Sequence, residues 1–359
     1  MLLPQMSPQL GLLVCLPAFF GGVHPLVEDI APTDPHIRYV GRFDFQDPKG
    51  PRCAWSASTV TIDYWGNDLR AHIADGGQNQ LQVVVDGMPT QIIRLHKGDD
   101  TYLIAHHDTP GAHSVQLVKR TEVFPGVTQF QGFELEGTLI HPKKPAHVIE
   151  VIGDSISCGY GNEGKTKEEH FSVNTENAYM TYGAIAARAL NADLVDIAWS
   201  GRTMWPTNSI PEIYDLALPP DKSSAWDLSQ QTPDVIVINL ATNDFGKVNP
   251  DEKQWTQAYC AFIDRLRKRA PTARIYCAMG PMMTDTWPPR VHALSTLKTY
   301  LREIVNMRND AGDSNVAMLE FETQNLERDG IGSDWHPNLK THQNMADRLI
   351  AAIKTDLGW

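Results

Sequence analysis

The chain divides into two parts that differ in the spacing of their hydrophobic residues. Residues 37–146 contain short runs in which apolar and polar side chains alternate, separated by turn residues such as Gly66-Asn67 and Asp86-Gly87. Short alternating runs at this spacing are typical of an antiparallel sandwich, and no long helical pattern interrupts them. We therefore predict an all-β, jelly-roll-like sandwich over residues 37–146, ending in a join that contains proline and lysine (140–146).

The second part, residues 147–359, alternates apolar runs with helical patterns. This alternation predicts an α/β domain built on a mainly parallel, doubly wound sheet. One of the helices is expected to open at Asn249-Pro250, with the asparagine as cap and the proline in the first turn. The predicted strands lie at 147–152, 193–197, 234–240, 274–279 and 316–321.

The N-terminus has a pattern of its own. The apolar stretch LGLLVCLPAFFGG (10–22) has about the length of a signal-peptide core and is too short to span a bilayer comfortably. No lysine or arginine precedes it, so a buried N-terminal strand or an artefact of the chosen gene start are the alternatives. We predict a signal peptide over 1–24, a linker over 25–36, and a secreted, extracellular protein.

Charge and cysteine content exclude several classes of function. The formal net charge is −12 and no long basic run occurs, which argues against nucleic acid or an anionic membrane surface as a partner. The cysteines beyond the N-terminal stretch form no CxxC pair or zinc spacing, so one or two disulfides of unassigned pairing are the expectation for a secreted chain. These residues are Cys53, Cys158, Cys260 and Cys277. We expect no metal, no cofactor and a monomer.

Polar residues follow three of the predicted strands and precede the last helix. Ser155 comes after the first strand, Gly201 after the second, Asn243 after the third, and His336 stands before the C-terminal helix. Loops at the carboxyl ends of parallel strands meet at one edge of the sheet, so we expect these four residues to lie together.

The four residue types suit acyl transfer. A serine hydroxyl needs an adjacent base, most often histidine, and the oxyanion that forms needs hydrogen-bond donors aimed at it. The Ser155 N–H, the Gly201 N–H and the Asn243 amide are candidate donors. Each residue alone has an ordinary structural explanation as a turn, cap or loop residue; their joint placement favours a site.

The residues resemble those of the SGNH/GDSL hydrolases. GDSIS resembles the first sequence block of that superfamily, Gly201 the second, ATNDF the third, and His336 the fifth. The chain is most similar to carbohydrate esterase family 2, whose members include acetyl xylan esterases. This resemblance is carried by the N-terminal sandwich and by the stretches GDSISCGYGNEG, WSGR and SDWHPN.

This resemblance implies a flavodoxin-like hydrolase domain. It also implies Ser155 as nucleophile and His336 as general base, with Ser155, Gly201 and Asn243 as the oxyanion hole. The implied reaction is removal of O-acetyl groups from plant-type polysaccharides or oligosaccharides, such as xylan or glucomannan, through an acyl-enzyme.

Three positions depart from the common patterns. Ala241 replaces a glycine of the superfamily, which we expect to change little, and Ser157 stands where a Gly-x-Ser-x-Gly elbow ends in glycine. Ser333, not aspartate, lies three residues before His336, while Asp334 lies two before it. Residues two apart in an extended segment point the same way, so the Asp334 side chain is one candidate to orient His336. The resemblance implies a second candidate, a main-chain oxygen, because some members of carbohydrate esterase family 2 have a Ser-His dyad oriented by a backbone carbonyl.

Tryptophans are the candidates for sugar binding, because their faces stack on the apolar patches of sugar rings. Trp205 and Trp287 lie in loops expected to face the cleft, and the alternative is that they brace those loops. We expect Trp335 to pack and so fix the histidine loop, and Asp154 to have a structural role beside Ser155.

The sequence leaves two other functions open as alternatives. A lipase or thioesterase of the same superfamily would need a broad apolar groove, and no long apolar insertion accompanies the catalytic loops. A carbohydrate-binding protein with a weakly active hydrolase domain would need no intact nucleophile and base.

Overall fold

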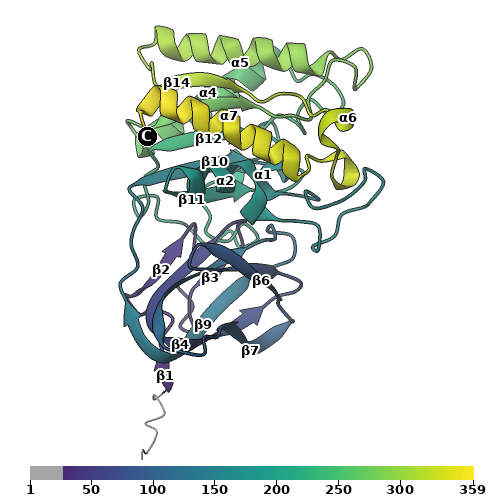
Figure 1. The fold of residues 1–359 in the computed structure, drawn as a ribbon. Helices are drawn as coiled ribbons and strands as arrows, with labels where there is room; N and C mark the ends of the chain where they lie inside the picture. The colour runs from purple at the N-terminus through teal and green to yellow at the C-terminus, as the bar shows by residue number, and fades with distance from the viewer. Residues whose placement is uncertain (1–26) are drawn as a thin grey trace, which may run out of the picture.

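The structure, a computed structural model, describes residues 27–359. An all-β domain and an α/β domain are stacked on one another, and the segment after Ile140 leads from the first into the second (Figure 1). The predicted signal peptide (1–24) lies outside the described residues. The segment 25–36, expected to be a linker, contains strand β1 (Val27–Ile30), which pairs antiparallel with β9 (Thr128–Ile140), so this part of it belongs to the sandwich sheet.

The β-domain is a two-layered antiparallel structure in which one long strand belongs to both layers. This strand, β4 (Thr59–Asp75), pairs with β8 along its first half and with β7 along its second half. Gly66-Asn67, expected to form a turn between strands, lies inside β4 at a bulge where the pairing with β9 shifts register. A Cβ atom on Gly66 would meet the Glu136 carbonyl oxygen at 2.2 Å, so the close approach of backbones at this bulge requires glycine.

The hydrophobic core of this domain lies between the two layers. Alternate residues of β4, including Val60, Ile62 and Leu69, face the core and are fully or almost fully buried. The other strands are β2 (Ile37–Val40), β3 (Arg52–Cys53), β5 (Gln80–Val85), β6 (Met88–Arg94), β7 (Gly98–Ala105) and β8 (Gly111–Lys119).

The α/β domain contains a five-stranded parallel sheet in the order β11-β10-β12-β13-β14. All five predicted strands are confirmed: β10 (His147–Gly153), β11 (Ala192–Ala198), β12 (Val235–Asn239), β13 (Arg274–Met279) and β14 (Val316–Glu320). This is the flavodoxin-like order, in which the direction of winding reverses between β10 and β12. Loops after those two strands therefore border the crevice where such folds place their sites.

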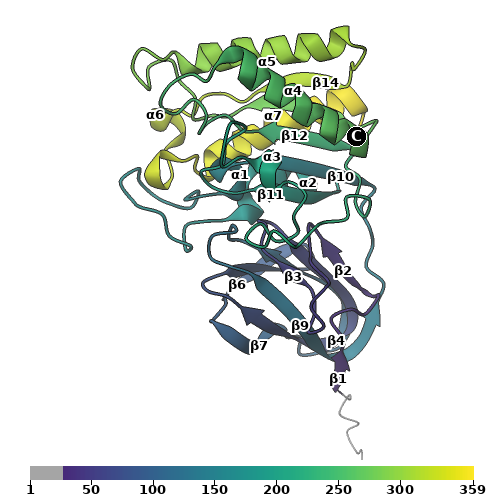
Figure 2. The ribbon, with the colours of Figure 1, turned by 180° about the vertical axis from the view of Figure 1, so that it is seen from behind.

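Helices cover both faces of the sheet. Ile149 and Val151 of β10 pack on the side of α2 and α7, whereas Val148 and Ile152 pack on the side of α4 and α5. Figures 1 and 2, taken from opposite sides, show α7 in front of the sheet in one view and α4 in front in the other. The helices are α1 (Ser155–Cys158), α2 (Tyr182–Ala189), α3 (Ile210–Ile213), α4 (Glu252–Arg269), α5 (Ala293–Asp310), α6 (Leu326–Asp329) and α7 (Leu339–Leu357).

Helix α4 begins two residues later than the sequence suggested. Asp251 is the N-cap, because its carboxylate accepts a hydrogen bond from the Gln254 N–H at 2.9 Å. The Asn249 side chain instead donates to the Val291 carbonyl oxygen at 2.7 Å and so joins this loop to the segment before α5.

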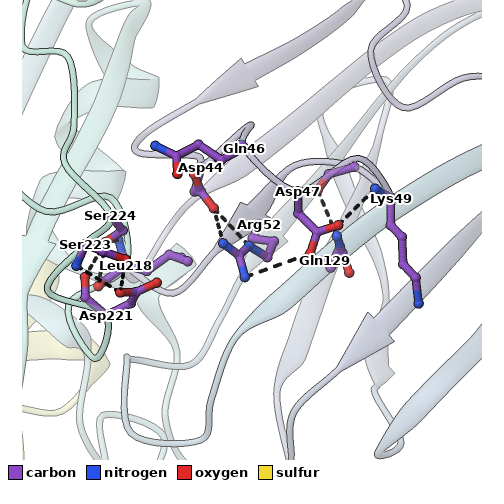
Figure 3. A network of polar contacts seen from close by, with 11 residues as sticks. Asp44, Gln46, Asp47, Lys49, Arg52, Gln129, Leu218, Asp221, Ser223 and Ser224 are labelled. Atoms are coloured by element: carbon purple, nitrogen blue, oxygen red, sulfur yellow. Dashed lines mark hydrogen bonds and ion pairs between the residues drawn. The ribbon is translucent and has the colours of Figure 1, made fainter.

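The two domains share a packed interface. Trp55 and Val123 of the β-domain belong to the same buried cluster as the α4 and α5 side of the sheet, and the Trp55 indole N–H donates to the Leu216 carbonyl oxygen at 3.1 Å. Beside it, Arg52 is hydrogen-bonded to Asp44 across the hairpin that faces the turn 218–224 of the α/β domain (Figure 3). Hydrophobic and polar contacts therefore both cross the boundary between the β-domain and the α/β domain.

The four cysteines of the described region are free thiols, so the disulfides considered above do not form among them. Between residues 27 and 359, no helix has the length and apolar character needed to cross a bilayer. In the same part of the chain, no three histidine, cysteine or acidic side chains gather in a way that suits a metal ion.

Candidate active site

Ser155 and His336 meet at the carboxyl edge of the sheet. The His336 Nε2 atom lies 2.9 Å from the Ser155 Oγ atom, a hydrogen-bonding distance between residues that are 181 positions apart. Ser155 is the first residue of the short helix α1, directly after β10. The Asp154 carboxylate caps this helix by accepting from the Ile156 N–H at 3.0 Å, which holds the turn that presents the serine.

The other ring nitrogen of His336 contacts a main-chain oxygen. Its Nδ1 atom lies 3.1 Å from the Asp334 carbonyl oxygen. Asp334 and Trp335 have φ angles of +47° and +66°, so the chain makes a left-handed turn that brings this carbonyl back toward the ring. Such angles are unfavourable for side chains with a Cβ atom, and they persist because neighbouring contacts hold the turn.

The Asp334 carboxylate is engaged elsewhere. It accepts hydrogen bonds from the Tyr160 hydroxyl at 2.9 Å and the Phe171 N–H at 2.8 Å, and it pairs with His170 at 2.9 Å. Of the two alternatives for orienting His336, the main-chain oxygen is therefore the one that has the contact. The chain was expected to be extended here, and it makes a left-handed turn instead.

Burial changes the basicity of His336. Removal from water lowers the pKa of its imidazole to about 4, while the carbonyl contact from Asp334 acts in the opposite direction. The ring is therefore neutral at physiological pH, and neutral imidazole is the form that can accept a proton from serine.

Gly201 lies in the loop that follows β11. Gly201 has a φ angle of +75°, a conformation that favours glycine, and neither its N–H nor that of Ser155 has a hydrogen-bond partner among residues 27–359. The Asn243 side-chain amide donates to the Arg202 carbonyl oxygen at 2.8 Å and lies 3.5 Å from the Asp154 carboxylate. The three donors suggested by the sequence thus lie on loops that contact one another.

Asp244 connects the Gly201 and Asn243 loops, a role that the sequence analysis missed. Its carboxylate accepts hydrogen bonds from the Met204 and Trp205 N–H groups, at 3.0 and 2.9 Å, and from the Trp255 indole at 2.8 Å. Because desolvation raises the pKa of Asp244, these donors are what stabilise its charged form. The sequence pair Asn243-Asp244 was a signal for this role, but only Asn243 was considered as a site residue.

Ala241 adopts a conformation that normally belongs to glycine. Its φ angle is +105°, and its side chain is fully buried at the end of β12. The glycine found at this position in the wider superfamily is explained by that angle, so the alanine costs conformational energy that the sequence did not reveal.

The segment that follows α1, including Tyr160 and Gly161, packs against the loop that carries His336. The Tyr160 ring lies 4.2 Å from the His336 ring, centroid to centroid, and its hydroxyl donates to Asp334. The Gly161 carbonyl oxygen accepts from the Ser333 N–H at 2.9 Å. Tyr160 was also missed, because nothing in its spacing indicates a contact with a residue 174 positions away.

The three tryptophans have different surroundings. Trp287 is 70% exposed and Trp335 is 51% exposed, and both line a pocket of about 790 Å³ beside the histidine loop. Trp335, which was expected to pack and so fix that loop, has a half-exposed ring with the Lys167 ammonium 4.1 Å from its centroid. Trp205 lies outside this pocket and packs partly buried against the core near α4, which fits the alternative of a bracing side chain.

Comparisons with known proteins relate both domains to one family. Residues 39–143 match the sequence model of the carbohydrate esterase 2 N-terminal domain, and residues 151–343 match that of the GDSL-like lipase/acylhydrolase family. A solved family two carbohydrate esterase from Clostridium thermocellum, in complex with cellohexaose, is 42% identical with a TM-score of 0.85. The alignment covers 90% of this chain and 99% of that one.

The chain belongs to carbohydrate esterase family 2. Among curated members, the cellulase/esterase CelE of Acetivibrio thermocellus is 42% identical over 91% of this chain, but the chain spans only 40% of that relative's length. An acetylxylan esterase / glucomannan deacetylase of Cellvibrio japonicus is 26% identical over 92% of this chain and 91% of its own length. The predicted family and two-domain fold are confirmed.

Proposed function

We propose that this chain is a serine esterase that removes O-acetyl groups from plant-type polysaccharides or oligosaccharides through an acyl-enzyme. The observation that carries the proposal is the contact between the Ser155 hydroxyl and His336, whose second nitrogen is held by the Asp334 carbonyl oxygen. A neutral imidazole at 2.9 Å from the hydroxyl satisfies the geometric requirement for general-base activation of serine.

In the proposed reaction, His336 accepts the Ser155 proton as the Oγ atom attacks the acetyl carbonyl carbon. The oxyanion that forms is stabilised by the Ser155 and Gly201 N–H groups and by the Asn243 amide. His336 then donates its proton to the departing sugar oxygen, leaving acetyl-Ser155. Water, deprotonated by His336, attacks this ester, and collapse of the second intermediate releases acetate and restores the Ser155 hydroxyl.

We propose that the pocket beside the histidine loop binds the sugar part of the substrate. Trp287 is largely exposed and Trp335, which has the Lys167 ammonium over its ring, is half-exposed, whereas polar groups such as Gln324 and Thr286 share the same pocket. Flat aromatic faces next to hydrogen-bonding side chains suit the stacked C–H faces and hydroxyl edges of sugar rings. The relative from Clostridium thermocellum was solved with cellohexaose, which supports a glucan-like backbone as a candidate ligand. We further propose that the protein acts outside the cell, where such polymers occur.

Acetate release by the wild type and by Ser155→Ala tests the proposal. The substrates are acetylated xylan, acetylated glucomannan and acetylated monosaccharides, with 4-nitrophenyl esters of increasing acyl length alongside. The proposal expects acetate from the polymers, a preference for acetyl over longer chains, and loss of activity in Ser155→Ala. Equal rates for the two proteins would favour a binding protein with a weakly active domain. A preference for long chains would favour a lipase or thioesterase.

Trp287→Ala separates sugar binding from the chemical step. If Trp287 stacks on the sugar, the KM for acetylated polymer rises roughly fivefold, since a ring packed on an aromatic face contributes on the order of 1 kcal/mol. The rate on 4-nitrophenyl acetate, which has no sugar, stays the same. An equal loss on both substrates would contradict the sugar-binding role.

A further inference from the structure

A glutamate of the β-domain reaches into the α/β domain beside the oxyanion donors. Glu122 lies in the connection between β8 and β9, and it is 2% exposed. Its Oε2 atom accepts a hydrogen bond from the Ser200 N–H at 2.8 Å, and its Oε1 atom accepts from the Ser200 hydroxyl at 2.6 Å. Ser200 is the residue directly before Gly201 in the chain.

This contact fixes one side of the peptide unit that carries the Gly201 N–H. Ser200 is held at both its N–H and its hydroxyl by the same carboxylate. On the other side, the Asn208 amide donates to the Gly201 carbonyl oxygen at 3.0 Å. With both neighbours held, the N–H of Gly201 has a defined direction, which an oxyanion donor requires.

The connection that carries Glu122 is itself anchored in the α/β domain. The Glu122 N–H donates to the Glu176 carboxylate at 3.1 Å, and the Lys119 ammonium donates to the Glu122 carbonyl oxygen at 2.6 Å. The Cys158 thiol of α1 lies 3.9 Å from the Glu122 carboxylate. Desolvation raises the pKa of Glu122, and the two hydrogen bonds from Ser200 oppose that shift. The Ser200 contact therefore also stabilises the ionised carboxylate of Glu122.

We propose that Glu122 is a positioning residue for the oxyanion-binding loop, supplied to the hydrolase-like domain by the β-sandwich. The inference rests on the proposed esterase function and goes beyond it, because it assigns the sandwich a part in the chemical step. Glu122 acts through Ser200 and Gly201 and does not touch the reacting atoms.

Three variants and a matched control test the assignment, with 4-nitrophenyl acetate as substrate. Glu122→Ala removes both acceptors, and we expect kcat to fall roughly 10²-fold with KM little changed, the cost of misplacing a catalytic group by about 1 Å. Glu122→Gln should retain most of kcat, because its amide oxygen can accept from the Ser200 N–H while its NH₂ group donates to the Ser200 hydroxyl. Ser200→Ala removes only the hydroxyl contact, and we expect a roughly tenfold loss of kcat.

Asp193→Ala is the control for damage to the domain interface. Asp193 pairs with Arg38 of the β-domain, so this variant also breaks a contact between the domains, but at the opposite end of β11. Ser200 and Asp193 are about 20 Å apart along the strand direction. We expect Asp193→Ala to keep wild-type kcat even where it lowers the melting temperature.

A second readout is the affinity for an arylboronic acid, which forms a tetrahedral adduct with an active-site serine. Affinity should fall in Glu122→Ala in parallel with kcat and be preserved in Glu122→Gln. Three results would overturn the proposal. One is an unchanged kcat in Glu122→Ala, and another is a loss in Glu122→Gln as large as that in Glu122→Ala. The third is a loss of kcat in Asp193→Ala equal to that in Glu122→Ala. If Glu122→Ala does not fold, wild-type kcat in Ser200→Ala overturns it instead.

The outcome is separable from that of the proposed function. An active Ser155→Ala variant refutes the esterase mechanism itself, whereas an inactive Ser155→Ala with a fully active Glu122→Ala refutes only the positioning role.

Discussion

The orientation of His336 by a main-chain oxygen makes a sharp prediction for Asp334→Asn. The Asp334 carbonyl oxygen, which contacts the imidazole at 3.1 Å, is unaffected by a change in the side chain. An asparagine oxygen can still accept from the Phe171 N–H and the Tyr160 hydroxyl, and its NH₂ group can donate to His170 when that ring adopts the other tautomer. The left-handed turn should therefore survive.

The expected size of the effect distinguishes the two mechanisms. In a Ser-His-Asp triad, replacement of the orienting aspartate by asparagine lowers kcat about 10⁴-fold, because the imidazole is held in the wrong tautomer. If a main-chain carbonyl orients the ring, Asp334→Asn should cost less than about tenfold, since only hydrogen-bond strength around Tyr160 changes. His336→Ala, which removes the base, should cost at least about 10³-fold.

Steady-state hydrolysis of 4-nitrophenyl acetate by the three proteins, with melting temperatures as a folding control, measures these losses. Comparable losses in Asp334→Asn and His336→Ala, with both variants folded, would refute the main-chain mechanism. They would show that the carboxylate reaches the imidazole during turnover.

Three further outcomes follow from the geometry of the site. The pKa of His336 is lowered to about 4, and its neutral form is the active one. The value of kcat/KM should therefore stay level from neutral pH down to about pH 4 and fall about tenfold per pH unit below it. A fall in kcat/KM centred near pH 6.5, the ordinary pKa of histidine, would contradict this. Asn243→Ala should lower kcat by about 10²–10³-fold with KM little changed, and a rate within threefold or so of the wild type would exclude its amide as an oxyanion donor. Ala241→Gly should raise the free energy of unfolding by about 1 kcal/mol, since it relieves a residue at φ +105°; a lower melting temperature in calorimetry would show that the alanine's packing outweighs the strain.

The sequence predicted the residues whose position follows from local pattern and sheet geometry. Ser155, Gly201 and Asn243 each follow an apolar run, and parallel strands bring their carboxyl ends to one edge, so the convergence of these loops was predictable without coordinates. The same pattern reasoning identified all five strands of that sheet.

Residues that act through long-range contacts were not predictable in this way. Glu122 lies in a loop of the other domain, and no periodicity connects it to Ser200. Asp334 was misjudged for a different reason: two consecutive positive φ angles at non-glycine residues are rare, so an extended chain was the natural assumption. Gly66-Asn67 has the composition of a turn, yet pairing on both sides keeps it inside a bulged strand.

The central claim is that Ser155 becomes acetylated during turnover, and its acetylation can be measured directly. The enzyme is mixed with an acetylated glucomannan oligosaccharide or 4-nitrophenyl acetate, quenched in acid within the first turnovers, digested and analysed by peptide mass spectrometry. The account predicts one added acetyl group on the peptide that contains Ser155, and none on that peptide in Ser155→Ala. Turnover by the wild type with acetyl groups only on other residues, or sustained turnover by Ser155→Ala, would contradict it.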